Sequence, residues 1–166
     1  GDSENYVNIG NKLPTLVGKY KATLSVKNPN YTASEASVDF EITPITTEVK
    51  VKSFDDTFTY DGTEHTKNAY DVLWANNASP ATDNKLPNGD KVTAVITGKV
   101  RDVKDTALEN NTIGKITITN KDNVDVTNCY SNIVKAAGKL TVNPITTPIV
   151  VTAGSDTKVY NGAELT

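Results

Sequence analysis

At 166 residues, the chain is long enough for one domain or two small ones. Its net charge is -3, and its 17 lysine and arginine residues are scattered, so no basic stripe is available to follow a nucleic-acid backbone. No segment approaches the roughly 20 consecutive apolar residues that cross a bilayer. We therefore expect neither nucleic-acid binding nor membrane insertion.

The residue types favour strands over helices. Thr, Asn and Val are abundant, whereas Leu, Glu and Ala are too irregularly spaced to give a helix a continuous apolar face. Cys129 is the one cysteine, so an intrachain disulfide is excluded, and methionine is absent. A composition without disulfides and with little to oxidise fits an exposed protein of a bacterium better than a small eukaryotic secreted module.

The first predicted strand spans residues 19–27. Tyr20, Ala22, Leu24 and Val26 share one face of it, and polar residues share the other. This two-residue period is typical of a strand with one buried face. Further strands are indicated by the same alternation at Val38, Phe40 and Ile42; Val49 and Val51; Phe58 and Tyr60; Val72–Trp74; Val92, Ala94 and Ile96; Ile116 and Ile118; and Leu140 and Val142.

Turn residues separate these strands, for example Asp61-Gly62, Asn161-Gly162 and the segment 87–90. Because turns and not helices connect the strands, we expect antiparallel pairing and two packed sheets. An all-β, immunoglobulin-like sandwich is the favoured fold. A β-grasp-like fold is the alternative, because alternation identifies strands without giving their order.

An internal repeat organises the chain. Residues 40–66 align with residues 140–166 without a gap, and 11 of the 27 positions are identical. Chance would give about two. A weaker match relates the segment from Gly18 to Pro44 to the segment from Gly114 to Pro144. We therefore divide the chain into the C-terminal part of one repeat (1–44), a complete repeat domain (45–144) and the N-terminal strands of a following repeat (145–166).

Each repeat joins the next through a short connection that contains Pro44 or Pro144. Proline restricts its own backbone and that of the preceding residue, so neighbouring repeats should swing little. A repeat near 100 residues matches the size of an immunoglobulin-like domain. This organisation predicts a stalk of repeats placed end to end.

The signature Tyr60-Asp61-Gly62-Thr63, which returns as Tyr160-Asn161-Gly162-Ala163, resembles the "YDG" or MBG-type repeats of bacterial cell-surface proteins and adhesins. Later segments resemble the same repeats in order, at 86–90, 95–98, 125–130 and 137–142. The resemblance implies an extracellular, wall-associated or secreted β-sandwich array with no catalytic residues. It suggests no ligand.

The residue types needed for catalysis are scarce. His65 is the single histidine, which is too few for a triad or a zinc site, and we interpret it as an ordinary strand or loop residue. Cys129 has no basic neighbour in sequence and is interpreted as a buried free thiol. The acidic clusters at 55–56, 102–105 and 122–125 lack the spacing of an EF-hand. We expect no catalytic, cofactor or metal site.

Tyr70 and Trp74 are the candidate binding residues, because aromatic rings on a sandwich rim can stack on sugars; a core position is the alternative for the tryptophan. The favoured function is a non-enzymatic spacer that extends or presents the binding region of an adhesin. The alternative is a module that binds a host glycan or protein. The expected partners are neighbouring repeats, including head-to-tail self-association in which one molecule supplies strands that another lacks.

Overall fold

A computed structural model describes residues 10, 12–25, 29–30 and 34–164, and within them the chain is all-β. The expectation of very little helix is confirmed, since the described residues contain nine strands and only three short 3-10 turns. In chain order these elements are β1 (Gly18–Leu24), β2 (Ala36–Ile42), β3 (Val49–Ser53), β4 (Asp56–Thr59), β5 (Tyr70–Trp74), η1 (Thr82–Asn84), β6 (Lys91–Ile96), η2 (Val103–Asp105), β7 (Ile113–Thr119), η3 (Thr127–Cys129), β8 (Ile133–Ala136) and β9 (Leu140–Asn143).

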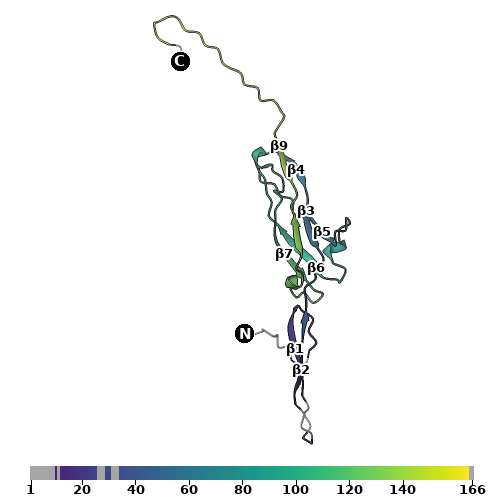
Figure 1. The fold of residues 1–166 in the computed structure, drawn as a ribbon. Coiled ribbons are helices and arrows are strands. Elements are labelled where there is room, and N and C mark those ends of the chain that lie inside the picture. The colour runs from purple at the N-terminus through teal and green to yellow at the C-terminus, as the bar shows by residue number, and fades with distance from the viewer. Residues whose placement is uncertain (1–9, 11, 26–28, 31–33, 165–166) are drawn as a thin grey trace.

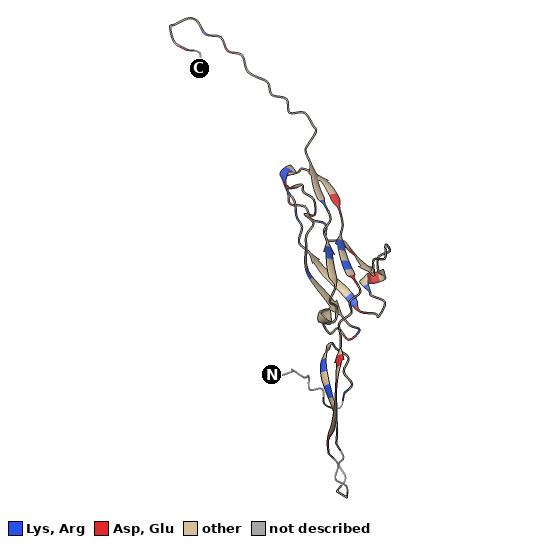
Figure 2. Ribbon diagram, viewed as in Figure 1, with Lys and Arg blue, Asp and Glu red and all other residues tan. Residues whose placement is uncertain are grey.

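The molecule is elongated (Figure 1). A hairpin of β1 and β2 forms one end, a body built from β3 to β9 follows it, and the C-terminal segment leaves the far end of the body. Lysine, arginine, aspartate and glutamate are interspersed along the strands, as Figure 2 shows. No helix in the described part of the chain is long and apolar enough to span a membrane.

The hairpin confirms strands at both expected positions, but the apolar face that we expected to be buried is largely exposed, because no second sheet of the described residues covers it. β1 and β2 pair antiparallel from Gly18 opposite Ile42 to Leu24 opposite Ala36, which places the apolar residues of both strands on one face. The rings of Tyr20 and Phe40 stack with their centroids 5.5 Å apart. Val26, the last apolar residue of the predicted strand, lies outside the described residues.

The body contains seven strands; six lie at the predicted positions, the sequence pattern missed β8, and the strand pairing corrects a further expectation. β3 is the central strand of a three-stranded sheet; it pairs antiparallel with β5 and parallel with β8. β4 also pairs parallel, with β9. The prediction of wholly antiparallel pairing is therefore wrong. Parallel strands need a long crossover, and about 80 residues separate the two segments that pair.

The body has two apolar clusters. The larger one joins buried residues of the β5-β3-β8 sheet to buried residues of the antiparallel pair β6 and β7; its members include Val49, Val51, Val72, Val92 and Ile118, all with no exposed surface. The smaller one surrounds Leu140 and Val142 of β9. The alternating residues of the complete repeat therefore form its core.

Buried polar contacts, which we call the polar cluster, lie between the parallel pair β3–β8 and the parallel pair β4–β9. Ser53 donates a hydrogen bond to the Asn111 carbonyl oxygen (2.6 Å) and accepts one from the Gly138 amide (2.9 Å). The Asn111 side chain donates to the carbonyl oxygens of Phe54 (2.7 Å) and Lys67 (3.1 Å). A side chain at Gly138 would place its Cβ 2.6 Å from the Phe54 carbonyl oxygen, so only glycine fits there. The polar cluster therefore supplies hydrogen-bond partners to backbone groups that lie between the two pairs of strands.

Asn111→Ala is expected to lower the free energy of unfolding by about 2 kcal/mol, because two carbonyl oxygens lose their donor inside the body. Gly138→Ala is expected to destabilise at least as much, because its contacts are backbone atoms that cannot rotate away. Urea denaturation followed by Trp74 fluorescence measures both. The control is Asn143→Ala, whose side chain is exposed, and it should change stability by less than about 0.5 kcal/mol. Equal stabilities for all three variants would contradict this account of the polar cluster.

The C-terminal segment behaves differently from its repeat counterpart. Val49 and Val51 are fully buried in β3, whereas the aligned Ile149 and Val151 are 90% and 87% exposed and belong to no strand. The strands expected there are not formed in this chain. β3 is held by β5 and β8, which both follow it in sequence, whereas no strand of the described residues pairs with residues 149–153. The repeat boundaries themselves stay a prediction.

The turn at the "YDG" signature is nevertheless the same in both copies. Asp61 accepts a hydrogen bond from the Thr63 amide (2.8 Å), and Asn161 accepts one from the Ala163 amide (3.1 Å). The glycine between them has a positive φ in each case, 81° at Gly62 and 75° at Gly162. The "YDG" signature is thus an Asx turn that forms with or without a neighbouring sheet.

Candidate functional site

The connection between the hairpin and the body is held by hydrogen bonds. Directly after Pro44, the Ile45 amide donates to the Cys129 carbonyl oxygen (2.8 Å), and the Ile45 carbonyl oxygen accepts from the Ser131 amide (2.9 Å). The Asn132 side chain donates to the Thr46 carbonyl oxygen (3.3 Å). The connection is therefore pinned to the body along its length, as a stiff joint between repeats requires.

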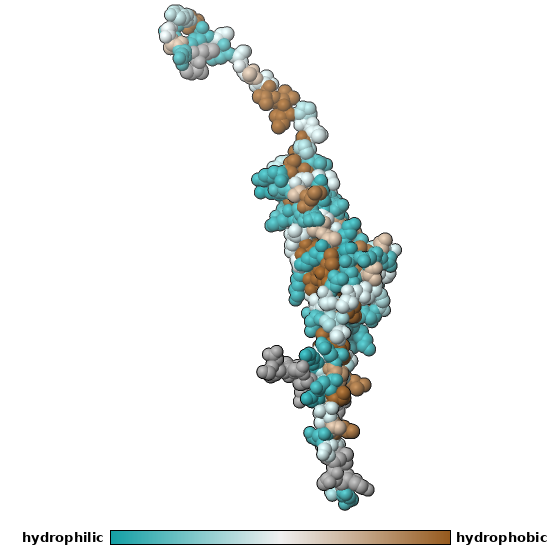
Figure 3. Space-filling model, viewed as in Figure 1, coloured by the Kyte–Doolittle hydropathy of each residue, from teal (hydrophilic) through white to brown (hydrophobic). Residues whose placement is uncertain are grey.

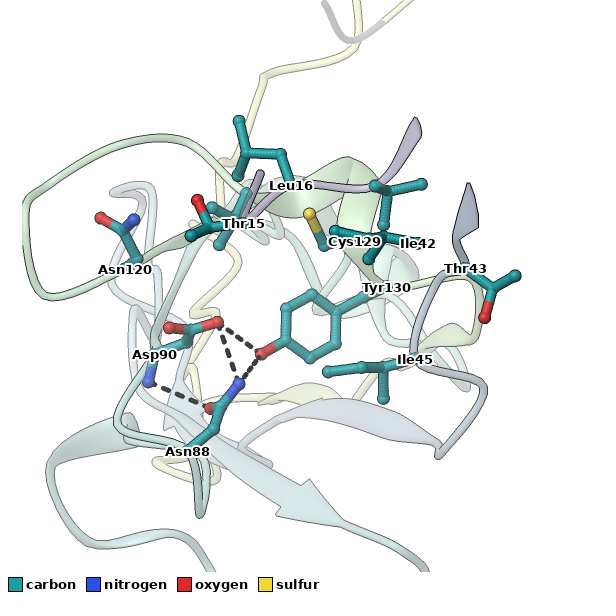
Figure 4. Close-up of a pocket in the computed structure, with 12 residues that line it drawn as sticks. Thr15, Leu16, Ile42, Thr43, Ile45, Asn88, Asp90, Asn120, Cys129 and Tyr130 are labelled. Atoms are coloured by element: carbon teal, nitrogen blue, oxygen red, sulfur yellow. Dashed lines mark hydrogen bonds between the residues drawn. The ribbon is translucent and has the colours of Figure 1, made fainter. Parts of the chain in front are cut away.

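A cavity of about 280 Å³ lies at this joint (Figure 4). Leu16, Ile42 and Ile45 line it from the hairpin side, and Asp90 and Tyr130 line it from the body. We call it the junction cavity. The body contributes most of its polar groups, among them Asn88, Asp90 and Asn120.

The polar wall is a closed hydrogen-bonded triangle. The Tyr130 hydroxyl donates to the Asp90 carboxylate (2.6 Å) and accepts from the Asn88 side-chain amide (2.8 Å). Asn88 also donates to Asp90 (3.1 Å), which completes the triangle shown in Figure 4. The ring of Trp74 packs edge-on against Tyr130, with centroids 6.5 Å apart. Because these groups satisfy one another's hydrogen bonds, the triangle holds the turn 87–90 against Tyr130, which lies just before β8. This arrangement favours a structural role over a catalytic one.

Burial, followed by the hydrogen bond to Asp90, raises the pKa of Tyr130 from its ordinary value of 10.0 to about 12. The neutral hydroxyl is thus the form that the folded state favours. The stabilisation is fully present below pH 10 and is lost as the pH rises from about 10 to about 12.

Tyr130→Phe should lower stability at pH 7 by about 1 to 2 kcal/mol, because Asp90 and Asn88 lose their shared partner. The variant should also lose less stability than the parent protein between pH 10 and 12, because it has no hydroxyl to ionise. Urea denaturation at a series of pH values tests both effects. Tyr160→Phe is the matched control, since Tyr160 is 93% exposed, and it should follow the parent curve. Parallel curves for the parent and Tyr130→Phe would contradict the assignment.

The two predicted binding residues occupy opposite ends of β5. Both are half-buried, lie on the same strand face as Val72 and pack against the larger core cluster. The Tyr70 hydroxyl accepts a hydrogen bond from the Ala94 amide (3.2 Å). Trp74 lines a shallow hollow of about 220 Å³ with Asn77, Ser79, Pro80, Ala81, Lys85 and Pro87, and Tyr70 takes no part in it. The structure therefore does not bring the two rings together as one platform.

The remaining chemically interesting side chains have local structural partners. The His65 ring stacks on Phe58 at 4.4 Å, and its Nε2 lies 3.1 Å from the Asp61 carboxylate. Cys129 is half-buried and lines the junction cavity. In the acidic clusters, hydrogen bonds from the backbone amides of Arg101 and Asp102 and from Thr127 lower the pKa of Asp105 and Asp125. The described residues contain no group of three histidine, cysteine, aspartate or glutamate side chains that could hold a metal ion.

The triangle of Asn88, Asp90 and Tyr130 was not singled out from the sequence. The segment 87–90 is recognisable as a turn, but Tyr130 is 40 residues away from Asp90, and no short-range pattern connects them. The one signal in the sequence is that the segments 86–90 and 125–130, which contain these residues, both belong to the "YDG" resemblance.

No family model, curated protein or solved structure matches this chain.

Proposed function

We propose that this chain is part of a non-enzymatic repeat array, of the YDG/MBG type, that extends or presents the binding region of a bacterial cell-surface or secreted adhesin. The complete copy is an immunoglobulin-like sandwich in this proposal. Support for two layers comes from the larger core cluster, where fully buried residues of β3 and β5 meet those of β6 and β7.

The observation that carries the proposal is the placement of the two connections. The chain enters the body at one end through the pinned segment after Pro44 and leaves at the opposite end after Pro144 (Figure 1). A domain with its connections at opposite ends adds length with each copy. Charges of both signs are interspersed along the ribbon in Figure 2, and the net charge is -3, so the charge pattern favours no strongly charged partner.

A spacer should have a stiff joint. We expect β1–β2 and the body to tumble together, so that backbone amide relaxation by NMR gives the same rotational correlation time for both. The double substitution Ser131→Ala and Asn132→Ala should separate the two correlation times, because it removes side-chain hydrogen bonds to Ile45 and Thr46. Ser79→Ala is the control away from the joint. A parent protein whose hairpin already tumbles independently would argue against a spacer.

A second candidate is a module that binds glycans or proteins, and the hollow beside Trp74 favours it. The hollow combines an indole ring with amide, hydroxyl and ammonium groups, which is the mixture that sugar-binding surfaces use. A glycan array tests this candidate. A hit that disappears in Trp74→Ala and persists in Tyr160→Phe would favour binding over spacing; an array without hits would leave the spacer as the better proposal.

A further inference from the structure

The two edges of β9 are both covered. β4 pairs with one edge in parallel, Asp56 opposite Leu140 and Phe58 opposite Val142. At the other edge of β9, the Asn110 side chain exchanges two hydrogen bonds with the Leu140 backbone (2.6 and 2.9 Å). The Thr106 hydroxyl accepts a further one from the Val142 amide (2.8 Å). These side chains imitate a neighbouring strand and leave no edge for a further one.

The repeat counterpart of β9 is the end of β2, and its surroundings are incomplete by comparison. β1 pairs with β2, but no other strand of the described residues does. The apolar face of the hairpin is open to solvent: Leu24 is 72% exposed, Val38 63% and Phe40 40%. A hollow of about 360 Å³ lies among Ala22, Leu24, Ala36 and Val38. Among the described residues, no strand therefore covers the outer edge of β2 as β4 covers an edge of β9.

The repeat counterpart of β3 and β4 is the C-terminal segment 149–160, and it too lacks partners. Ile149, Val150, Val151, Val159 and Tyr160 are 85% to 93% exposed. The core-facing positions Val49, Val51 and Ser53 of β3 correspond to Ile149, Val151 and Ala153, so the inward side of this strand is apolar in both copies. Figure 3 shows hydrophobic surface both on the hairpin and at the start of this segment.

We propose that segment 149–160 of one molecule adds as a parallel strand to the free edge of β2 in a second copy of the chain. The β4–β9 register then places Asp156 opposite Phe40, Thr157 opposite Glu41 and Lys158 opposite Ile42. Residues 150–154 then lie opposite residues 34–38, so Val150 lies on the same face as Ala36 and Val38, beside the apolar hollow of the hairpin. The interface is a second instance of one that this molecule already forms internally.

The arrangement of the molecule makes this association linear. β2 runs toward the body, and the C-terminal segment leaves the far end of the body in the same direction (Figure 1), so parallel addition keeps successive molecules in one orientation. A head-to-tail contact of this kind produces open chains. A single added strand covers less than the roughly 800 Å² per partner of a stable complex, so we expect association at tens to hundreds of micromolar.

Sedimentation velocity of the full chain from 10 µM to 1 mM tests the association. We expect the sedimentation coefficient to rise with concentration, and Val150→Asp in the segment or Val38→Asp on the hairpin to weaken association at least tenfold. Leu108→Asp is the control, because Leu108 is 81% exposed and belongs to neither surface. A parent protein that stays monomeric at 1 mM, or a control that weakens association equally, would overturn the proposal.

Disulfide trapping tests the register. In a Cys129→Ser background, Glu41→Cys protein is mixed with Thr157→Cys protein, and separately with Thr152→Cys protein as the shifted control. The 41–157 disulfide should form at least ten times faster than the 41–152 disulfide. Equal rates would overturn parallel addition to β2. The inference depends on the same internal repeat as the proposed function, but the relaxation experiment on the joint is done on dilute monomer, so each can fail alone.

Discussion

The parallel pairing of segments 49–59 and 133–143 is the constraint on which the rest of the body depends. It brings the beginning and the end of the complete repeat side by side, so that β5 adds to one edge of β3 and the side chains of Asn110 and Thr106 cover β9. Neither β4 nor β9 has a second strand beside it. The bend between the two halves of the ladder is possible because Ser53, Asn111 and Gly138 satisfy the backbone groups that the sheet leaves unpaired there.

The same pairing explains how the joint between repeats is built. Because β3 lies against β8, the residues that precede β3 must pass the residues that precede β8. Ile45 meets Tyr130 in this way and exchanges backbone hydrogen bonds with its neighbours. The triangle of Asn88, Asp90 and Tyr130 then fixes the body's side of the junction cavity. The hydrogen bonds at the connection between hairpin and body are thus a consequence of the sheet and not of proline alone.

Much of the strand pattern was predictable, because alternation reports which side chains face a core. Val49, Val51, Val92 and Leu140 are buried as their alternation indicates. The parallel pairing was not predictable, since alternation is the same for either direction and short turns made antiparallel pairing the simpler expectation. Tyr70 and Trp74 share a strand face, as their spacing requires, but the hollow beside Trp74 does not include Tyr70, because the surrounding loops, and not the strand, decide where the surface is concave.

The two copies of the repeat separate what sequence determines from what tertiary structure decides. The Asp61-Gly62 and Asn161-Gly162 turns are alike because an Asx turn needs only a few consecutive residues and a glycine that accepts a positive φ. Residues 49–53 form a strand and residues 149–153 do not, although both carry β-branched apolar residues at the first and third positions. A strand's backbone hydrogen bonds lie outside the strand itself, so its formation depends on a partner elsewhere in the fold, and only the tertiary structure supplies one.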